Sequence, residues 1–232
     1  MIQKILAADR HYADYGSLQT YWLFSFSDYY DPENMNFGSL RVFNDDVIGA
    51  QSGFPDHPHR DMEILTIVHS GTLTHGDSIG TSATIGAGEV QRMSAGGGIV
   101  HSEMNKGDEP VHLYQLWFSP NQKTESGYEQ KTVDTSQSPL SVLASYEASP
   151  GVLLRSDAVV YSLKLAPRES TTLIVPEGWG CFVYVKEGVV DLSSSSETES
   201  FREGDQARVL QETNISFSSE NGAEALVVVV RV

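Results

Sequence analysis

Two short stretches of this sequence place metal-binding side chains two residues apart. The first holds His57 and His59, and the second holds His101 and Glu103. Side chains alternate between the two faces of a β-strand, so each pair projects from one face. Pro58 has no N–H for a sheet ladder, which predicts an edge strand. If the two strands adjoin, three imidazoles and one carboxylate converge on one point.

Such a ligand set suits a borderline divalent metal, namely Fe(II), Mn(II), Ni(II), Cu(II) or Zn(II), rather than Ca²⁺ or Mg²⁺. Four protein ligands leave one or two positions open on a five- or six-coordinate metal, as catalysis requires.

The identity of the carboxylate ligand is open between Glu103 and Glu63. Glu63 lies four residues beyond His59, roughly 13 Å along a straight strand, so it reaches the metal only after a turn. Glu103 needs no turn to join His101, and we expect it to be the ligand. Glu63 then remains as a partner that orients an imidazole.

The remaining histidines are expected to be structural or exposed; they are His11, His69, His75 and His112. Apolar residues flank both stretches and favour an apolar pocket, although some must face the core; they are Phe54, Ile64, Met93, Ile99, Val100 and Met104. The run Gly96–Gly98 allows the backbone to turn tightly just before His101.

Many short strands position these residues. β-Branched or aromatic runs bounded by turn residues predict strands at 64–69, 72–75, 83–85, 111–118, 181–185, 189–192, 206–210 and 226–232. Helix signals are sparse, with candidates at 137–148 and, more weakly, at 10–18. This pattern predicts an all-β fold of sandwich or barrel type with a few short helices.

A spacing of glycine turns indicates an internal repeat. Gly71 and Gly88 in the first half correspond to Gly188 and Gly204 in the second. We therefore expect two tandem β-barrels, one spanning residues 1–120 and one spanning 121–232. The repeat aligns the histidine and glutamate positions with Ile174, Pro176, Phe217 and Ser219, so the C-terminal barrel is expected to lack metal ligands.

Composition narrows the class of protein. The net charge is −16 and both halves are acidic, which disfavours direct binding to nucleic acid. The single cysteine, Cys181, fits a reducing compartment. No secretory signal and no apolar run of membrane-spanning length is evident. We therefore expect a cytoplasmic protein.

The motifs resemble a known family. His57-x-His59-x3-Glu63-x7-Gly71 resembles the first cupin motif, and Gly88-x5-Ser94-x-Gly96 followed by His101-x3-Asn105 resembles the second, with Ser94 where many cupins have proline. The resemblance is closer to pirin and the bacterial pirin-like quercetinases, through "GFPDHPHRDMEILT", "QRMSAGGGIVHSE", "HLYQLWF" and "FSFSDYYDPENMNFGSLRVFNDDVI". It covers roughly residues 20–120 at the motif level and extends more weakly to the C-terminus.

This resemblance implies two tandem cupin barrels and a metal, most commonly Fe(II), held by His57, His59, His101 and Glu103. It implies quercetin 2,3-dioxygenase activity, in which O2 opens the heterocycle of a flavonol and CO leaves. Glu103, or secondarily Glu63, would take the proton of the flavonol hydroxyl.

Two alternative functions stay open. One is an iron-binding regulator that binds a partner protein without catalysis, and the other is a cupin enzyme acting on a small polar substrate.

Overall fold

The computed structural model describes residues 1–123, 125–147 and 149–232. As predicted, the fold is all-β and jelly-roll-like, built from several sheets that do not close into a barrel. Within these residues the one helical element is a 3-10 turn, η1 (Ala7–Asp9). No helix in the described part of the chain is long and apolar enough to cross a membrane.

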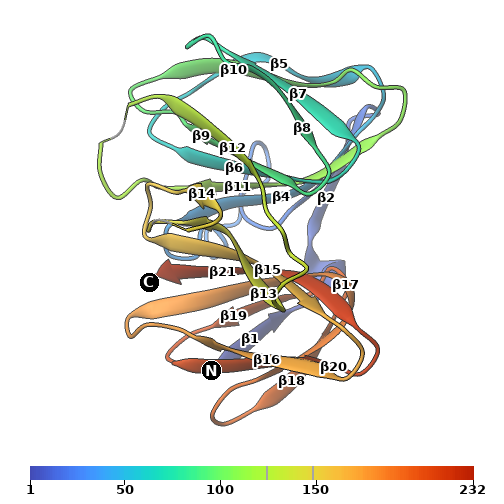
Figure 1. The fold of residues 1–232 in the computed structure, drawn as a ribbon, viewed down its shortest axis with the longest axis vertical. Coiled ribbons are helices and arrows are strands. Elements are labelled where there is room, and N and C mark those ends of the chain that lie inside the picture. The colour runs from blue at the N-terminus through green and yellow to red at the C-terminus, as the bar shows by residue number, and fades with distance from the viewer. Residues whose placement is uncertain (124, 148) are drawn as a thin grey trace. The chain divides into compact units, whose positions relative to one another are not determined.

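One compact unit comprises residues 11–133 and 146–157. Its strands are β2 (His11–Asp14), β3 (Leu18–Trp22), β4 (Leu40–Ile48), β5 (Ser52–His59), β6 (Glu63–Ser70), β7 (Thr72–Asp77), β8 (Ser82–Gly86), β9 (Glu89–Ser94), β10 (Ile99–Asn105), β11 (Val111–Phe118), β12 (Gly127–Thr132) and β14 (Val152–Leu153). A four-stranded sheet, β5-β10-β7-β8, faces a seven-stranded sheet, β12-β9-β6-β11-β4-β3-β2 (Figure 1).

The other compact unit comprises residues 1–10, 134–145 and 158–232. Its strands are β1 (Ile2–Ile5), β13 (Leu140–Ser145), β15 (Ala158–Leu165), β16 (Glu169–Ile174), β17 (Trp179–Ser193), β18 (Thr198–Arg202), β19 (Gln206–Val209), β20 (Asn214–Ser219) and β21 (Ala223–Arg231). Strands β1, β19, β17, β21, β15 and β13 follow one another in a sheet. Phe217, which the repeat aligns with a ligand position, is fully buried in this unit's core.

The N-terminal segment belongs to the second unit rather than to the histidine-bearing one. Strand β1 pairs with β19, and residues 1–10 cluster with the C-terminal strands. The boundary at residue 120 remains a prediction.

Both helix predictions are wrong. Strand β13 occupies the middle of the 137–148 segment, whose last residue lies outside the described chain, and the 10–18 segment contains β2 and the first residue of β3. In both segments pairing with a neighbouring strand satisfies the backbone, and this outweighs weak helix propensity.

Three of the four turns predicted from glycine are confirmed, at Gly71, Gly88 and Gly204, whereas Gly188 lies within the long strand β17 near a shift in its pairing with β21. Gly71, Gly88, Gly188 and Gly204 all have φ between +77° and +81°, a conformation that side-chain-bearing residues seldom adopt. At Gly71 an added Cβ would also lie 2.9 Å from the Pro110 carbonyl oxygen. Gly71, Gly88 and Gly204 thereby separate consecutive strands.

Candidate metal centre

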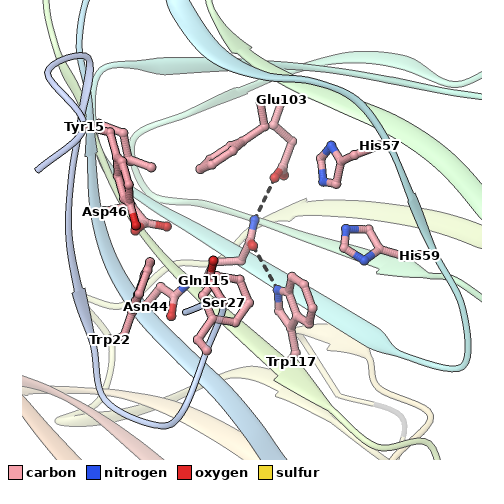
Figure 2. Close-up of a pocket in the computed structure, with 13 residues that line it drawn as sticks. Tyr15, Trp22, Ser27, Asn44, Asp46, His57, His59, Glu103, Gln115 and Trp117 are labelled. Atoms are coloured by element: carbon pink, nitrogen blue, oxygen red, sulfur yellow. Dashed lines mark hydrogen bonds between the residues drawn. The ribbon is translucent and has the colours of Figure 1, made fainter. Parts of the chain in front are cut away.

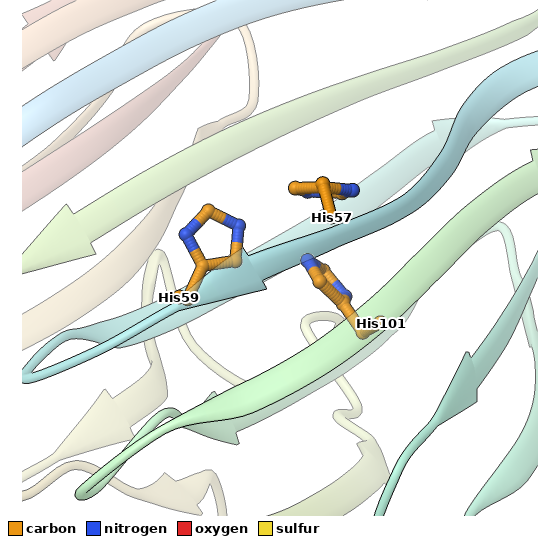
Figure 3. Close-up of side chains that lie close together, drawn as sticks. All are labelled: His57, His59 and His101. Atoms are coloured by element: carbon orange, nitrogen blue, oxygen red, sulfur yellow. The ribbon is translucent and has the colours of Figure 1, made fainter.

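Three histidines converge on the inner face of the four-stranded sheet. As predicted, β5 is an edge strand, and it pairs with β10 so that His101 lies opposite His57. The ring centroids of His57 and His59 are 4.8 Å apart, and those of His57 and His101 are 4.4 Å apart. One ring nitrogen from each of the three side chains lies within 4.8 Å of the others. Figure 3 shows the rings projecting from the two strands toward one another.

Glu103 lies next to this cluster because it follows His101 by two residues on β10, whose pairing with β7 is regular, so both side chains project from one face. The pairing of β10 with β5 shifts between His101 and Glu103, so that Glu103 pairs with Phe54 and the extra residue of this bulge lies in β5. Glu103 is buried, and one of its oxygens lies within 4.8 Å of ring nitrogens of His101 and His75. It thus shares His101 with the three-histidine cluster.

Polar side chains of the facing sheet fix the Glu103 carboxylate. The Thr66 hydroxyl and the Gln91 amide donate to Oε1 at 3.2 and 3.1 Å, and the Gln115 amide donates to Oε2 at 2.7 Å. These three donors form one row across β9, β6 and β11, because Thr66 pairs with both Gln91 and Gln115. The row sets the orientation of the carboxylate before any ligand arrives.

The histidines are suited to bind a cation. Burial and the neighbouring imidazoles lower the pKa of His59 to about 4, and burial followed by His57 lowers the pKa of His101 to about 3. Both rings are therefore neutral near pH 7, the form that binds metals. The Nε2 atom of His59 and both ring nitrogens of His101 are buried without a hydrogen-bond partner. Unsatisfied buried nitrogens of this kind fit a divalent metal ion.

His75, expected to be structural or exposed, is a buried neighbour of the cluster. Its Nε2 donates to Asp77 Oδ2 at 3.0 Å, and its ring lies 5.4 Å from that of His101. Its Nδ1 is buried and unpaired. The spacing His75-x-Asp77 on a strand resembles the other same-face pairs, and it is the signal that would have identified this residue.

Glu63 lies away from the histidines. It is fully buried, its Oε2 accepts from the Arg155 backbone N–H at 3.2 Å, and it belongs to neither candidate ligand group. Burial raises its pKa, while hydrogen bonds from Ser94 and the Arg155 backbone and the charge of Arg92 oppose this shift. The structure therefore does not bring Glu63 into position to act on a ligand of the histidine cluster or to orient an imidazole.

An aromatic cavity of about 230 Å³ adjoins the cluster (Figure 2). This volume approaches the lower limit of about 300 Å³ for small-molecule pockets. His57, His59 and Glu103 lie at one side, and two exposed residues, Tyr15 and Ser27, mark the mouth. The other lining residues are Leu18, Trp22, Phe26, Asn44, Asp46, Phe54, Gln115 and Trp117.

Three rings form one wall of this cavity. Phe26 packs edge-on against Trp22 and Trp117, at centroid distances of 5.4 and 5.3 Å. Trp117 also meets His59 edge-on at 4.7 Å. Continuous aromatic surface beside the imidazoles suits a planar aromatic ligand.

Most of the cavity lining comes from residues outside the set of apolar residues expected around the two metal-binding stretches. Of the apolar residues near the two motifs only Phe54 lines the cavity, whereas Ile64, Met93 and Ile99 pack in a separate core cluster. Gln115 and Trp117 of β11 also line the cavity, and seven lining residues come from the segment before residue 48. Its signal in the sequence was the density of aromatic residues between Tyr12 and Phe43.

Two family models match the chain. The pirin model matches residues 6–118, and a model described as the quercetinase C-terminal cupin domain matches residues 142–230. A quercetin 2,3-dioxygenase of Escherichia coli strain K12 is 37% identical over 228 residues, covering 97% of each chain. A pirin-like protein of Caulobacter vibrioides is 36% identical over 223 residues, covering 93% of this chain and 94% of its own.

Solved structures agree with this relationship. The bacterial pirin YhhW from Escherichia coli in complex with nickel(II) has a TM-score of 0.92 at 35% identity, covering 100% of this chain and 99% of its own. A quercetin 2,3-dioxygenase from Acinetobacter baumannii has a TM-score of 0.76 at 27% identity, covering 95% and 83%. With full-length relatives at this identity, the chain belongs to the pirin family of cupin proteins.

Proposed function

We propose that this protein is a metal-dependent dioxygenase of the quercetin 2,3-dioxygenase type. Its substrates would be a flavonol and O2, and its reaction would open the heterocycle and release CO. The observation that carries the proposal is the convergence of three imidazoles beside an aromatic cavity, with buried, unpartnered ring nitrogens on His59 and His101. The names of the full-length relatives support the same activity.

His57, His59, His101 and Glu103 are the proposed ligands, and Fe(II) is the proposed metal, with Mn, Ni, Cu or Zn also compatible with this donor set. When bound, the metal would supply a Lewis acid for an ionised substrate hydroxyl and an electron route to O2.

The protein's own side chains would orient the flavonol and take up its proton. Trp117, Trp22 and Phe26 offer flat apolar surface against which the ring system would stack. The Glu103 carboxylate, whose orientation three donors fix, is the proposed acceptor of the 3-hydroxyl proton. The aromatic wall would limit the access of water to the reacting carbons.

The site favours this activity over the two alternatives. A regulator that acts only by binding a protein needs no cavity at the metal, yet an aromatic cavity reaches the histidines. An enzyme for small polar substrates would need mostly charged walls, whereas two of the lining side chains are carboxylates and six are aromatic or aliphatic.

The test is oxygen uptake with quercetin by protein loaded anaerobically with Fe(II), Mn(II), Ni(II) or Cu(II), together with detection of CO. We expect turnover that the double variant His57→Ala/His101→Ala abolishes. His69→Ala is the matched control, because His69 is exposed and outside the cluster. Turnover that survives the double substitution would exclude the proposed metal mechanism.

A further inference from the structure

Two acceptor side chains lie in the cavity on the side away from the histidines. Asn44 and Asp46 sit two residues apart on β4, so both project inward, and they are 4% and 2% exposed. Figure 2 shows them across the cavity from His57 and His59. Neither belongs to the candidate ligand groups.

Both side chains can accept further hydrogen bonds. The Oδ1 atom of Asn44 is buried without a hydrogen-bond partner. Asp46 receives a hydrogen bond from Thr20, which leaves other lone pairs of its carboxylate free. Burial raises the pKa of Asp46 to about 7, although the facing Thr20 hydroxyl opposes this shift. Leaving a buried acceptor unpaired costs roughly 1–3 kcal/mol, so a ligand that supplies donors would recover this free energy.

Other polar side chains of the cavity wall are already engaged. Gln115 donates to Glu103 and accepts from the Trp117 indole N–H at 2.9 Å, so both ends of its amide are used. The Tyr15 hydroxyl donates to Asp28. Asn44 and Asp46 are therefore the side chains best placed to receive hydrogen bonds from a molecule in the cavity.

We propose that Asn44 and Asp46 form a subsite that accepts hydrogen bonds from phenolic hydroxyl groups at the end of the substrate farthest from the histidines. The preferred substrates are then polyhydroxylated planar aromatics rather than bare aromatic skeletons. This inference rests on the proposed function, because it assumes that the reacting end of a flavonol faces the histidines. It assigns the two residues to specificity and not to the chemical step.

The test compares quercetin, which carries four hydroxyl groups besides the 3-hydroxyl, with 3-hydroxyflavone, which carries none. Their dissociation constants would be measured by calorimetry on Ni(II)-loaded protein without O2, and kcat/KM would be measured separately in air. We expect the wild type to bind quercetin about 10-fold or more tightly. Asp46→Leu and Asn44→Leu should each remove most of this preference while binding 3-hydroxyflavone as the wild type does.

Two further variants make the result decisive. Asp45→Asn removes a negative charge from the neighbouring residue, which pairs with His112, and should keep the wild-type preference. Asp46→Asn keeps the shape and one acceptor, so it should lose part of the preference even if Asp46→Leu does not fold.

Unchanged preference in both Asp46 variants, or equal weakening for both ligands, would overturn the subsite while leaving flavonol turnover intact. Absence of both binding and turnover for either flavonol in the wild type would instead refute the proposed function and the subsite with it.

Discussion

At the scale of single residues, the cavity holds a carboxyl group that its surroundings do not stabilise. Asp46 is buried, and burial is the largest cause that raises its pKa from 3.8 to about 7. A folded-state pKa above the unfolded-state value means that this group destabilises the fold increasingly as pH rises through that interval. A residue kept at such a cost is a candidate for function rather than for stability.

Asp46→Asn should therefore stabilise the protein in a pH-dependent way. The gain in free energy of unfolding should be on the order of 3 kcal/mol at about pH 8 and should shrink as the pH falls toward about 5. Urea unfolding at the two pH values would measure it, with Asp45→Asn as the control. A gain in free energy of unfolding that is the same at both pH values would contradict this explanation. Removing the cost of ionising a buried carboxyl must give a larger gain at the higher pH.

His75 provides a second prediction at this scale. The Nε2–H of His75 donates to Asp77, so the Nδ1 atom of His75 is left as an acceptor beside His101. A hydrogen bond from one ring nitrogen to a carboxylate orients an imidazole whose other nitrogen binds a metal. His75→Gln should weaken Ni(II) binding about 10-fold or more, measured by calorimetry, and should alter the visible spectrum of bound Ni(II). His69→Gln, on an exposed strand end, should do neither. Unchanged affinity and spectrum in His75→Gln would leave His75 with a packing role only.

At the scale of elements, the site depends on the pairing of β5 with β10. Gly53 sits opposite Met104 beside the bulge, with φ of +149°. A Cβ at this position would lie 2.3 Å from the Glu103 carbonyl oxygen and 2.8 Å from Met104 Cα. Backbone atoms cannot move aside as a flexible side chain does, so any added carbon must separate the two strands.

Gly53→Ala should therefore lower the free energy of unfolding by at least about 2 kcal/mol and weaken metal binding at the same time. Gly97→Ala is the matched control, because a Cβ there meets no atom within 4 Å. Chemical denaturation and Ni(II) calorimetry on both variants would test this. If Gly53→Ala binds metal normally and is as stable as Gly97→Ala, the strand pairing tolerates more expansion than the contacts indicate.

Features of the site that depend on local backbone geometry could be predicted from the sequence. Strand period and the position of Pro58 gave the edge strand and the shared face of His57 and His59, because both depend on local backbone geometry. The polar row that holds Glu103 was not predictable. Thr66 and Gln115 meet there only through non-local sheet register, and each looks like an ordinary strand residue in the sequence.

At the scale of the whole molecule, the candidate metal ligands gather in one of the two β units. Both candidate ligand groups lie in the unit of residues 11–133 and 146–157, and among the described residues no group of this kind lies in the other unit. The repeat was visible from glycine spacing alone. The pairing of β1 with the C-terminal strand β19 could not be predicted, because the sequence of a four-residue edge strand does not indicate which distant strand it pairs with.

This division predicts where metal binding stabilises the molecule. A ligand that binds only the folded state adds about 2.7 kcal/mol to the free energy of unfolding when its free concentration is 100 times its dissociation constant. The strands that hold the ligand must therefore open less often. Hydrogen exchange with and without Ni(II) should show slowed exchange in β5 and β10 and little change in β17 and β21. The double variant His57→Ala/His101→Ala should show no change anywhere. Equal protection of β17 in the wild type would mean that the two units open together, so that metal bound in one stabilises the entire chain.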